Sequence, residues 1–327
     1  MDIDMDALRT LEKTRDIPMD VLITTIESAL LLAYNKTEGA MPNARAVIER
    51  GNGHVAIMVE DYDEHGVLLG EFDDTPLGFG RIAASTARQV IMQRLREAED
   101  DQVVGEYRSR VGGLISGTIQ QGTSAHMVQV NVGDVEAVLP PPEQVPGERY
   151  KHGERLRAFV VSVERGTKGP AITLSRSHPS LVRQLFEMEV PEIADGVVVI
   201  EALAREAGHR TKIAVRATEA GVNAKGACIG EMGTRVRAVM NELNDEKIDI
   251  VDYNEDPAKF IAAALSPSKV NSVEILDEAE RRARVIVPDG QLSLAIGKEG
   301  QNARLAAKLT GWRIDILAAS GGKEPRY

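Results

Sequence analysis

Ile229-Gly230-Glu231-Met232-Gly233 and Ile296-Gly297-Lys298-Glu299-Gly300 are two copies of one short pattern, 67 positions apart in the chain. Each copy follows a short apolar helix pattern and leads into a longer one. Each is then followed by an Ile-Asp-Ile run, at residues 248–250 and 314–316. One GxxG turn can arise between two helices by chance. Two in matched helix–turn–helix–strand frames indicate a duplicated module.

The glycines of these turns suit a loop that must accept a phosphate group. A backbone that approaches an anion closely tolerates no Cβ, which favours glycine at both ends of the turn. The helix that follows offers free N–H groups and a favourable dipole. The two middle residues must project into solvent. This pattern is typical of KH modules, whose GxxG loop clamps the backbone of single-stranded nucleic acid.

We therefore predict that RNA is contacted by the loops, by the isoleucines before them, which would line an apolar groove, and by polar residues after them. For the polar residues, which fall off the apolar stripe of the following helix, a merely solvated helix face remains an alternative. Lys298 is the only middle residue with a charge that favours phosphate, so the second loop should contribute more electrostatic affinity. The predicted RNA-binding residues are Ile229, Gly230, Glu231, Met232, Gly233, Arg235, Arg237, Ile296, Gly297, Lys298, Glu299, Gly300, Asn302 and Arg304.

The periodicity of the chain predicts a multidomain α+β protein with four domains. Residues 1–107 read as an N-terminal α+β module that ends in a long connector helix. Residues 108–179 contain five short strand patterns separated by glycine breaks, which fit a closed barrel of the S1 (OB) type. Residues 180–252 and 253–327 read as two tandem type II KH units of order αββααβ. The connection between these units is short, so we expect one fixed orientation and a continuous track for RNA.

The barrel segment resembles S1 domains at both ends, in Gly113-Leu114-Ile115-Ser116-Gly117 and in Ile172-Thr173-Leu174-Ser175-Arg176. S1 domains bind single strands partly through exposed aromatic residues that stack on bases. This segment offers only Phe159, His126 and Tyr150. A role as spacer or as protein-contact domain therefore stands beside RNA binding.

Charge is distributed unevenly along the 327 residues. The net charge is −11, and residues 1–105 alone hold 10 basic and 20 acidic residues. Such a module is poorly suited to phosphate contact and better suited to a basic protein surface. The acidic N-terminus is no signal peptide, and no apolar run is long enough to span a membrane. Together with the single cysteine, Cys228, this predicts a cytoplasmic protein.

The sequence contains no constellation that predicts an enzyme. The six histidines lack metal-ligand spacing, there is no GxSxG motif, and Lys298 is followed by Glu299 where a Walker loop requires Ser or Thr. Cys228 lies on a helix pattern and is expected to be a small buried residue. We expect no catalytic residue, metal or cofactor.

The order of these domains resembles the NusA family of bacterial transcription elongation factors. Four segments also resemble that family in detail, residues 185–193, 226–230, 247–251 and 295–306. The resemblance implies a monomer that binds RNA polymerase through the acidic N-terminal domain and holds nascent single-stranded RNA, including antitermination sites in ribosomal RNA leaders. It implies effects on pausing, intrinsic termination and antitermination, and further Nus-type factors as partners. No acidic repeats follow the second KH unit, so autoinhibition by such repeats is not expected.

A second hypothesis belongs to a different class. The chain could be an S1/KH accessory protein of an RNA-degrading or ribosome-associated complex, with the acidic module as adaptor. The partner of the N-terminal module distinguishes the two.

Overall fold

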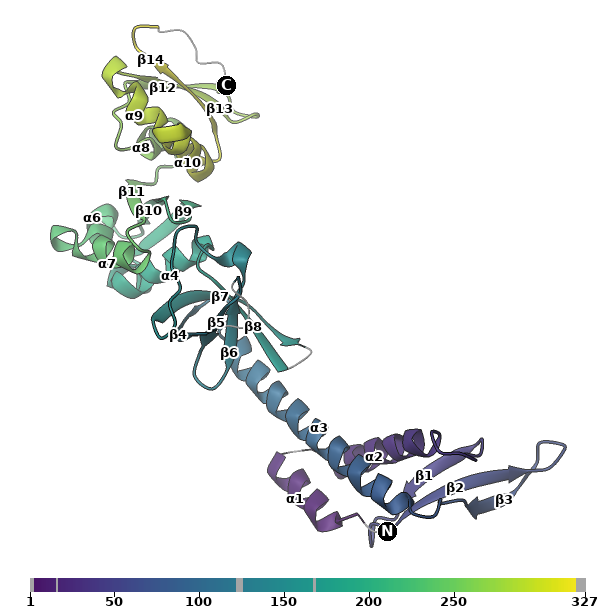
Figure 1. Cartoon of the computed structure of the whole chain (residues 1–327). Coiled ribbons are helices and arrows are strands. Elements are labelled where there is room, and N and C mark those ends of the chain that lie inside the picture. Colours follow the sequence, from purple (N-terminus) through teal and green to yellow (C-terminus); the bar gives the residue numbers. More distant parts are fainter. Residues whose placement is uncertain (1–2, 16, 122–125, 167–168, 322–327) are drawn as a thin grey trace. The chain divides into compact units, whose positions relative to one another are not determined.

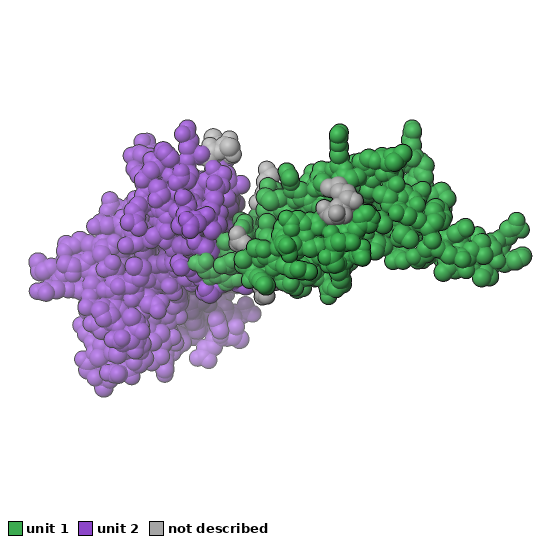
Figure 2. All heavy atoms as spheres, turned by 90° about the horizontal axis from the view of Figure 1, so that it is seen from below, with its two compact units in different colours: residues 1–106, 164–170 green, residues 107–163, 171–327 purple. Residues whose placement is uncertain are grey.

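The computed structural model describes residues 3–15, 17–121, 126–166 and 169–321. It divides into two compact units, which are considered separately. Unit 1 comprises residues 1–106 and 164–170, and unit 2 comprises residues 107–163 and 171–327 (Figure 2). None of the helices in the described ranges is both long and apolar enough to cross a bilayer.

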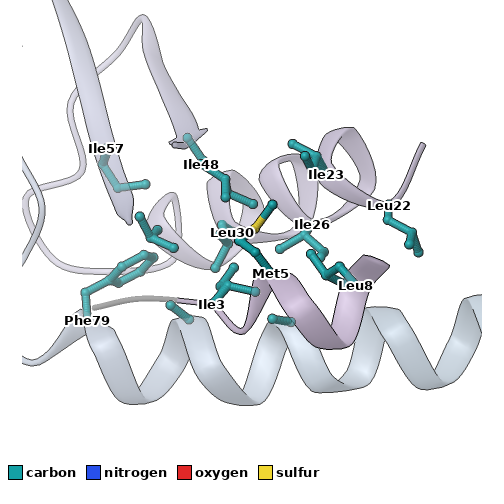
Figure 3. Packing of buried hydrophobic residues seen from close by; sticks show 14 of the residues in the cluster. Ile3, Met5, Leu8, Leu22, Ile23, Ile26, Leu30, Ile48, Ile57 and Phe79 are labelled. Carbon is teal, nitrogen blue, oxygen red and sulfur yellow. The ribbon is translucent and has the colours of Figure 1, made fainter. Parts of the chain in front are cut away.

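Unit 1 is an α+β domain in which two helices and a sheet pack on the long helix α3 (Figure 1). Leu22, Ile26 and Leu30 recur at helical spacing in α2 and are fully buried, and they belong to one apolar cluster with Leu8 of α1 and Ile57 of the sheet (Figure 3). The sheet is antiparallel, in the order β1-β2-β3. Its elements are α1 (Met5–Arg15), α2 (Met19–Tyr34), β1 (Ala44–Ile48), β2 (Val55–Tyr62), β3 (Leu68–Asp73) and α3 (Phe79–Arg108).

The first part of unit 2 is the five-stranded closed barrel that the sequence predicted, with strand order β4-β5-β6-β8-β7. Gly117 in β4 allows close approach, because a Cβ there would lie 2.5 Å from a side-chain carbon of Val130 and 2.6 Å from the Asn131 carbonyl oxygen. The strands are β4 (Leu114–Gln120), β5 (Val128–Asn131), β6 (Glu136–Leu139), β7 (Arg155–Gly166) and β8 (Gly169–Ser175).

Two KH units follow with the same topology. In each, the first two strands pair antiparallel and the third pairs parallel with the second, as the αββααβ order requires. Pro257 begins the first helix of the second unit, where Asp256 accepts a hydrogen bond from the Ala258 N–H. The first unit comprises α4 (Pro179–Glu189), α5 (Pro191–Ala194), β9 (Val198–Glu206), β10 (Arg210–Ala217), α6 (Ala224–Ile229), α7 (Thr234–Glu242) and β11 (Lys247–Asp252). The second comprises α8 (Pro257–Ala264), β12 (Ser272–Asp277), β13 (Arg282–Val287), α9 (Leu292–Ile296), α10 (Gln301–Thr310) and β14 (Arg313–Ala318).

The barrel and the first KH unit share a core. Phe159 of β7 packs in the same apolar cluster as Leu185 of α4, and its ring stacks on that of His178 at a centroid distance of 4.4 Å. This placement removes Phe159 from the aromatic residues that the barrel could offer to bases.

A buried arginine, Arg176, connects the barrel to the first KH unit. Arg176 has 2% of its side chain exposed and donates two hydrogen bonds to the Glu148 carboxylate, at 2.6 and 3.1 Å. It also donates to the Glu242 carbonyl of the KH unit at 2.8 Å. Burial alone would raise the pKa of Glu148, but the hydrogen bonds and charge of Arg176 outweigh it and lower that pKa.

The two KH units pack through the sheet of the first. Ala204 and Ala214 of that sheet belong to the apolar cluster of α8 and α10, so the second unit covers the sheet face opposite to α4, α6 and α7 (Figure 1). Lys212 is fully buried there and donates to Asp249 at 2.9 Å and to the Ser266 carbonyl at 2.7 Å. The two KH units are thus packed against each other.

Replacing Arg176 with alanine should lower the free energy of unfolding of unit 2 by about 3–5 kcal/mol, because the buried Glu148 carboxylate loses its partner. Urea titration of the full chain followed by circular dichroism measures the change. Arg216→Ala is the control, since its pair with Glu201 is exposed and should contribute less than about 1 kcal/mol. Equal effects of the two variants would contradict this account of the junction.

Candidate nucleic-acid interface

The two GxxG loops have the same backbone conformation although their side chains differ. Gly230 has φ 75° and ψ 171°, and Gly297 has φ 77° and ψ 172°. The third loop residues, Met232 and Glu299, are left-handed with φ 51° and 53°. The duplication seen in the sequence is therefore a duplication of loop geometry.

The first glycine of each loop is required by conformation and by space. A φ near 75° with ψ near 170° is a region that only glycine occupies readily. A Cβ on Gly230 would lie 2.7 Å from the Cγ of Arg235, and one on Gly297 would lie 2.8 Å from the backbone nitrogen of Asn302. Any larger residue would force the loop away from the helix that follows it.

The last glycine of each loop is left-handed and faces open space. Gly233 and Gly300 have φ 75° and 74°, and a Cβ on Gly300 would meet no atom within 4 Å. The loop surface at this position is therefore free for the close approach of a ligand backbone.

The middle residues of both loops project into solvent, as predicted. Glu231, Lys298 and Glu299 are exposed, and Met232 is 84% exposed. Ile229 and Ile296, the predicted groove walls, are half-buried directly before the loops. Neither loop is covered by protein in the described part of unit 2.

Arg237 and Arg304 hold the loops in this conformation from equivalent positions. Arg237 donates to the Met232 carbonyl at 2.5 Å, and Arg304 donates to the Glu299 carbonyl at 3.2 Å. Each guanidinium thus binds the carbonyl of the left-handed loop residue. Both side chains are exposed and can face a phosphate as well.

The side chains of Asn302 and Arg235 do not lie on a solvent-facing helix surface. Asn302 is 3% exposed, and its amide nitrogen donates to the carbonyls of Leu265, Leu294 and Ala295. Its buried side chain cannot contact RNA as the sequence analysis expected. The loop folds back over this position, so the side chain points under the glycine instead of outward.

Arg235 occupies the same place in the first unit. It is partly buried and donates at 2.8 Å to the Ala227 carbonyl and to the Glu192 carboxylate. Both residues therefore tie the helix before the loop to the helix after it. We assign them to positioning the loop.

Sequence periodicity did not reveal Glu206, which joins the second loop to the first KH unit. Arg304 donates to its carboxylate at 2.5 and 3.1 Å, and Gln301 donates to it at 3.0 Å. The hydrogen bond from Arg304 is the main reason that the pKa of Glu206 falls to about 2. No sequence signal identifies such a partner, because Glu206 and Arg304 are 98 residues apart.

Cys228 lies beneath the first loop and is fully buried, as predicted. Burial raises the pKa of its thiol to about 11, so the residue is a neutral core group at physiological pH.

Comparison with known proteins agrees with this geometry. Family models described as the NusA N-terminal domain, the NusA-like first KH domain and the NusA-like second KH domain match residues 5–62 and 63–101, 176–253 and 257–324, respectively. The chain is 59% identical over 323 residues to the transcription termination/antitermination protein NusA of Mycobacterium tuberculosis, covering 97% of this chain and 93% of that one. It is 45% identical to the protein of the same name from Bacillus subtilis, with 98% and 92% covered.

Alanine substitutions should separate the two kinds of loop glycine. Gly297→Ala should lower the stability of the second KH unit by about 3 kcal/mol or more, because conformation and contact both oppose a Cβ. Gly300→Ala should cost only about 1–2 kcal/mol, the penalty for a left-handed residue without a clash. Trp312, the only tryptophan, lies in this unit and reports its unfolding by fluorescence in urea. Equal losses would show that the two glycines are not distinguished by their surroundings.

Proposed function

The chain belongs to the NusA family of transcription termination/antitermination proteins, and on that premise we propose that it binds RNA polymerase and nascent RNA at the same time. It is an RNA-binding transcription factor and not an enzyme. In this proposal the acidic residues 1–107 dock on polymerase, and the barrel and KH units hold the emerging transcript. Pausing, intrinsic termination and antitermination are modulated through that transcript.

The observation that carries the RNA part is the pair of loops with matching backbone angles in one packed body. A KH loop clamps about four nucleotides of backbone. Two loops held together would therefore bind roughly eight unpaired nucleotides in one register. The proposed contacts are the exposed loop residues, with Arg237 and Arg304 beside them.

Charge supports the polymerase part. The excess of acidic over basic residues in residues 1–105 gives this module a field that favours a basic protein surface and disfavours RNA. The charge of the acidic N-terminal module thus suits polymerase as its partner, and RNA is left to the barrel and the KH units. We further propose that the chain is a monomer, that it binds leader sites of ribosomal RNA, and that it acts together with further Nus-type factors.

The alternative, an accessory protein of an RNA-degrading or ribosome-associated complex, shares the same RNA-binding arm. The relatives that cover nearly the whole chain bear the name of a transcription factor, which disfavours it.

Replacing Lys298 and Glu299 together with aspartates should weaken binding of a 16-nucleotide unpaired RNA by about tenfold or more, because a phosphate contact is lost and repulsion is added. Fluorescence anisotropy of the full chain with labelled RNA measures the affinity. Lys259→Asp makes the same change of net charge at an exposed position on α8 and should have little effect. Unchanged affinity in the loop variant would exclude the second loop as an RNA clamp.

The polymerase contact can be tested by affinity capture from a bacterial extract. The full chain should retain RNA polymerase, whereas residues 108–327 alone should not, and added salt should release the polymerase because the contact is electrostatic. Recovery of ribosomal or nuclease components without polymerase would favour the alternative.

A further inference from the structure

A groove runs along the junction between the barrel and the first KH unit. It consists of three adjoining hollows of about 280, 430 and 220 Å³. The first and third share Arg155 and Glu242, and the second and third share Arg149 and Asn244. Since neighbouring hollows share walls, we treat them as one continuous feature, the junction groove.

The junction groove is a cationic site in an acidic protein. Five cationic side chains line it, against three carboxylates, Glu148, Glu154 and Glu242. Each carboxylate already has a cationic partner, Glu148 and Glu242 with Arg176 and Glu154 with Lys151. The cationic residues are Arg149, Lys151, Arg155, Arg157 and Arg176.

Arg149 and Arg155 give the groove its unpaired charge. Both are exposed, and neither has an ion-pair partner among the described residues of unit 2. Lys151 is also exposed, and its 3.6 Å pair with Glu154 lies open to solvent, where such pairs are weak. Three cationic side chains can therefore turn to an anionic ligand without breaking the buried network around Arg176.

A short stretch of chain connects a hydrogen-bond partner of the second GxxG loop with the groove. Gln301, the residue directly after Gly300, donates to Glu206, and Gly208 lies in the wall of the groove two residues further along the chain. Two residues of extended chain span at most about 7 Å. The backbone of Glu206, whose side chain contacts the residue after the second loop, therefore lies within about 7 Å of the groove wall.

The chemistry of the groove fits a phosphate backbone better than a stack of bases. Phe159 is stacked on His178, and Tyr150 is held by hydrogen bonds with the Val145 N–H and the Glu148 carboxylate. The groups that remain available to a ligand are the cationic side chains of the groove.

We propose that the junction groove is a third RNA subsite, which binds the phosphates of unpaired nucleotides beyond those held by the two KH loops. The barrel then contributes to RNA binding through its edge with the KH unit and through charge. This inference rests on the proposed function, because the strand must first be clamped at the loops. Arg149, Lys151 and Arg155 are the residues that hold it.

The test compares two lengths of unpaired RNA, 8 and 16 nucleotides, on the full chain. Arg149, Lys151 and Arg155 are replaced together with alanine. The 8-nucleotide RNA should bind as before, and the 16-nucleotide RNA should bind about fivefold or more weakly at moderate salt. The slope of log Kd against log salt for the longer RNA should decrease by about 2, from roughly 0.7 per lost phosphate contact.

The control replaces Arg9, Lys13 and Arg50 of unit 1 with alanine, which removes the same charge from exposed positions. This control should change neither affinity. If the groove variant leaves the longer RNA unaffected, or weakens both lengths equally, the third subsite is refuted. The proposed function has a separate test. It fails if replacing Lys298 and Glu299 with aspartates leaves the binding of both RNAs unchanged.

A second measurement does not depend on substitutions. A 16-nucleotide RNA with photoreactive uridines beyond the eight held by the loops should crosslink to residues 145–155. Crosslinks of those uridines confined to the KH units would overturn the assignment.

Discussion

Burial of the first KH sheet on both faces is the constraint on which the RNA-binding arm depends. One face packs on the helices of its own unit, and the other packs on α8 and α10 of the second unit. A sheet covered in this way cannot tilt toward either layer without opening a packed core. The two loops, at the ends of α6 and α9, are therefore held at a fixed separation, as the proposed binding of one RNA strand by both loops requires.

Charged groups at these junctions make the packing specific. Arg205 and Glu246 are both almost fully buried and form two hydrogen bonds of 2.9 Å, and Arg205 also binds the carbonyls of Arg176 and His178. A buried charge without its partner is costly, so only one arrangement of barrel and KH unit satisfies all of them. Small residues such as Ala204 and Ala214 then allow the next unit to approach closely.

The sequence predicted those features that depend on neighbouring residues. The loops, their glycines and the order of helices and strands follow from local spacing, and the five-stranded barrel follows from its glycine breaks. The inward direction of Asn302 and Arg235 could not be predicted, because helical periodicity assumes that the chain continues straight from the loop. Contacts between residues far apart in the sequence could not be predicted either. The Glu206–Arg304 pair and the junction groove arise only when segments far apart in the chain come together.

The face of the second KH sheet that points away from its own helices differs from the covered face of the first KH sheet. Its middle row, Glu274-Arg284-Asp315, occupies the register of Ala204-Lys212-Asp249 in the first unit. A carboxylate thus stands where the covered face has a methyl group, and Ser272 likewise replaces Ala202. Both replacements are exposed to water. As in the capping repeat of a solenoid, this polar face disfavours the stacking of a further copy of the unit.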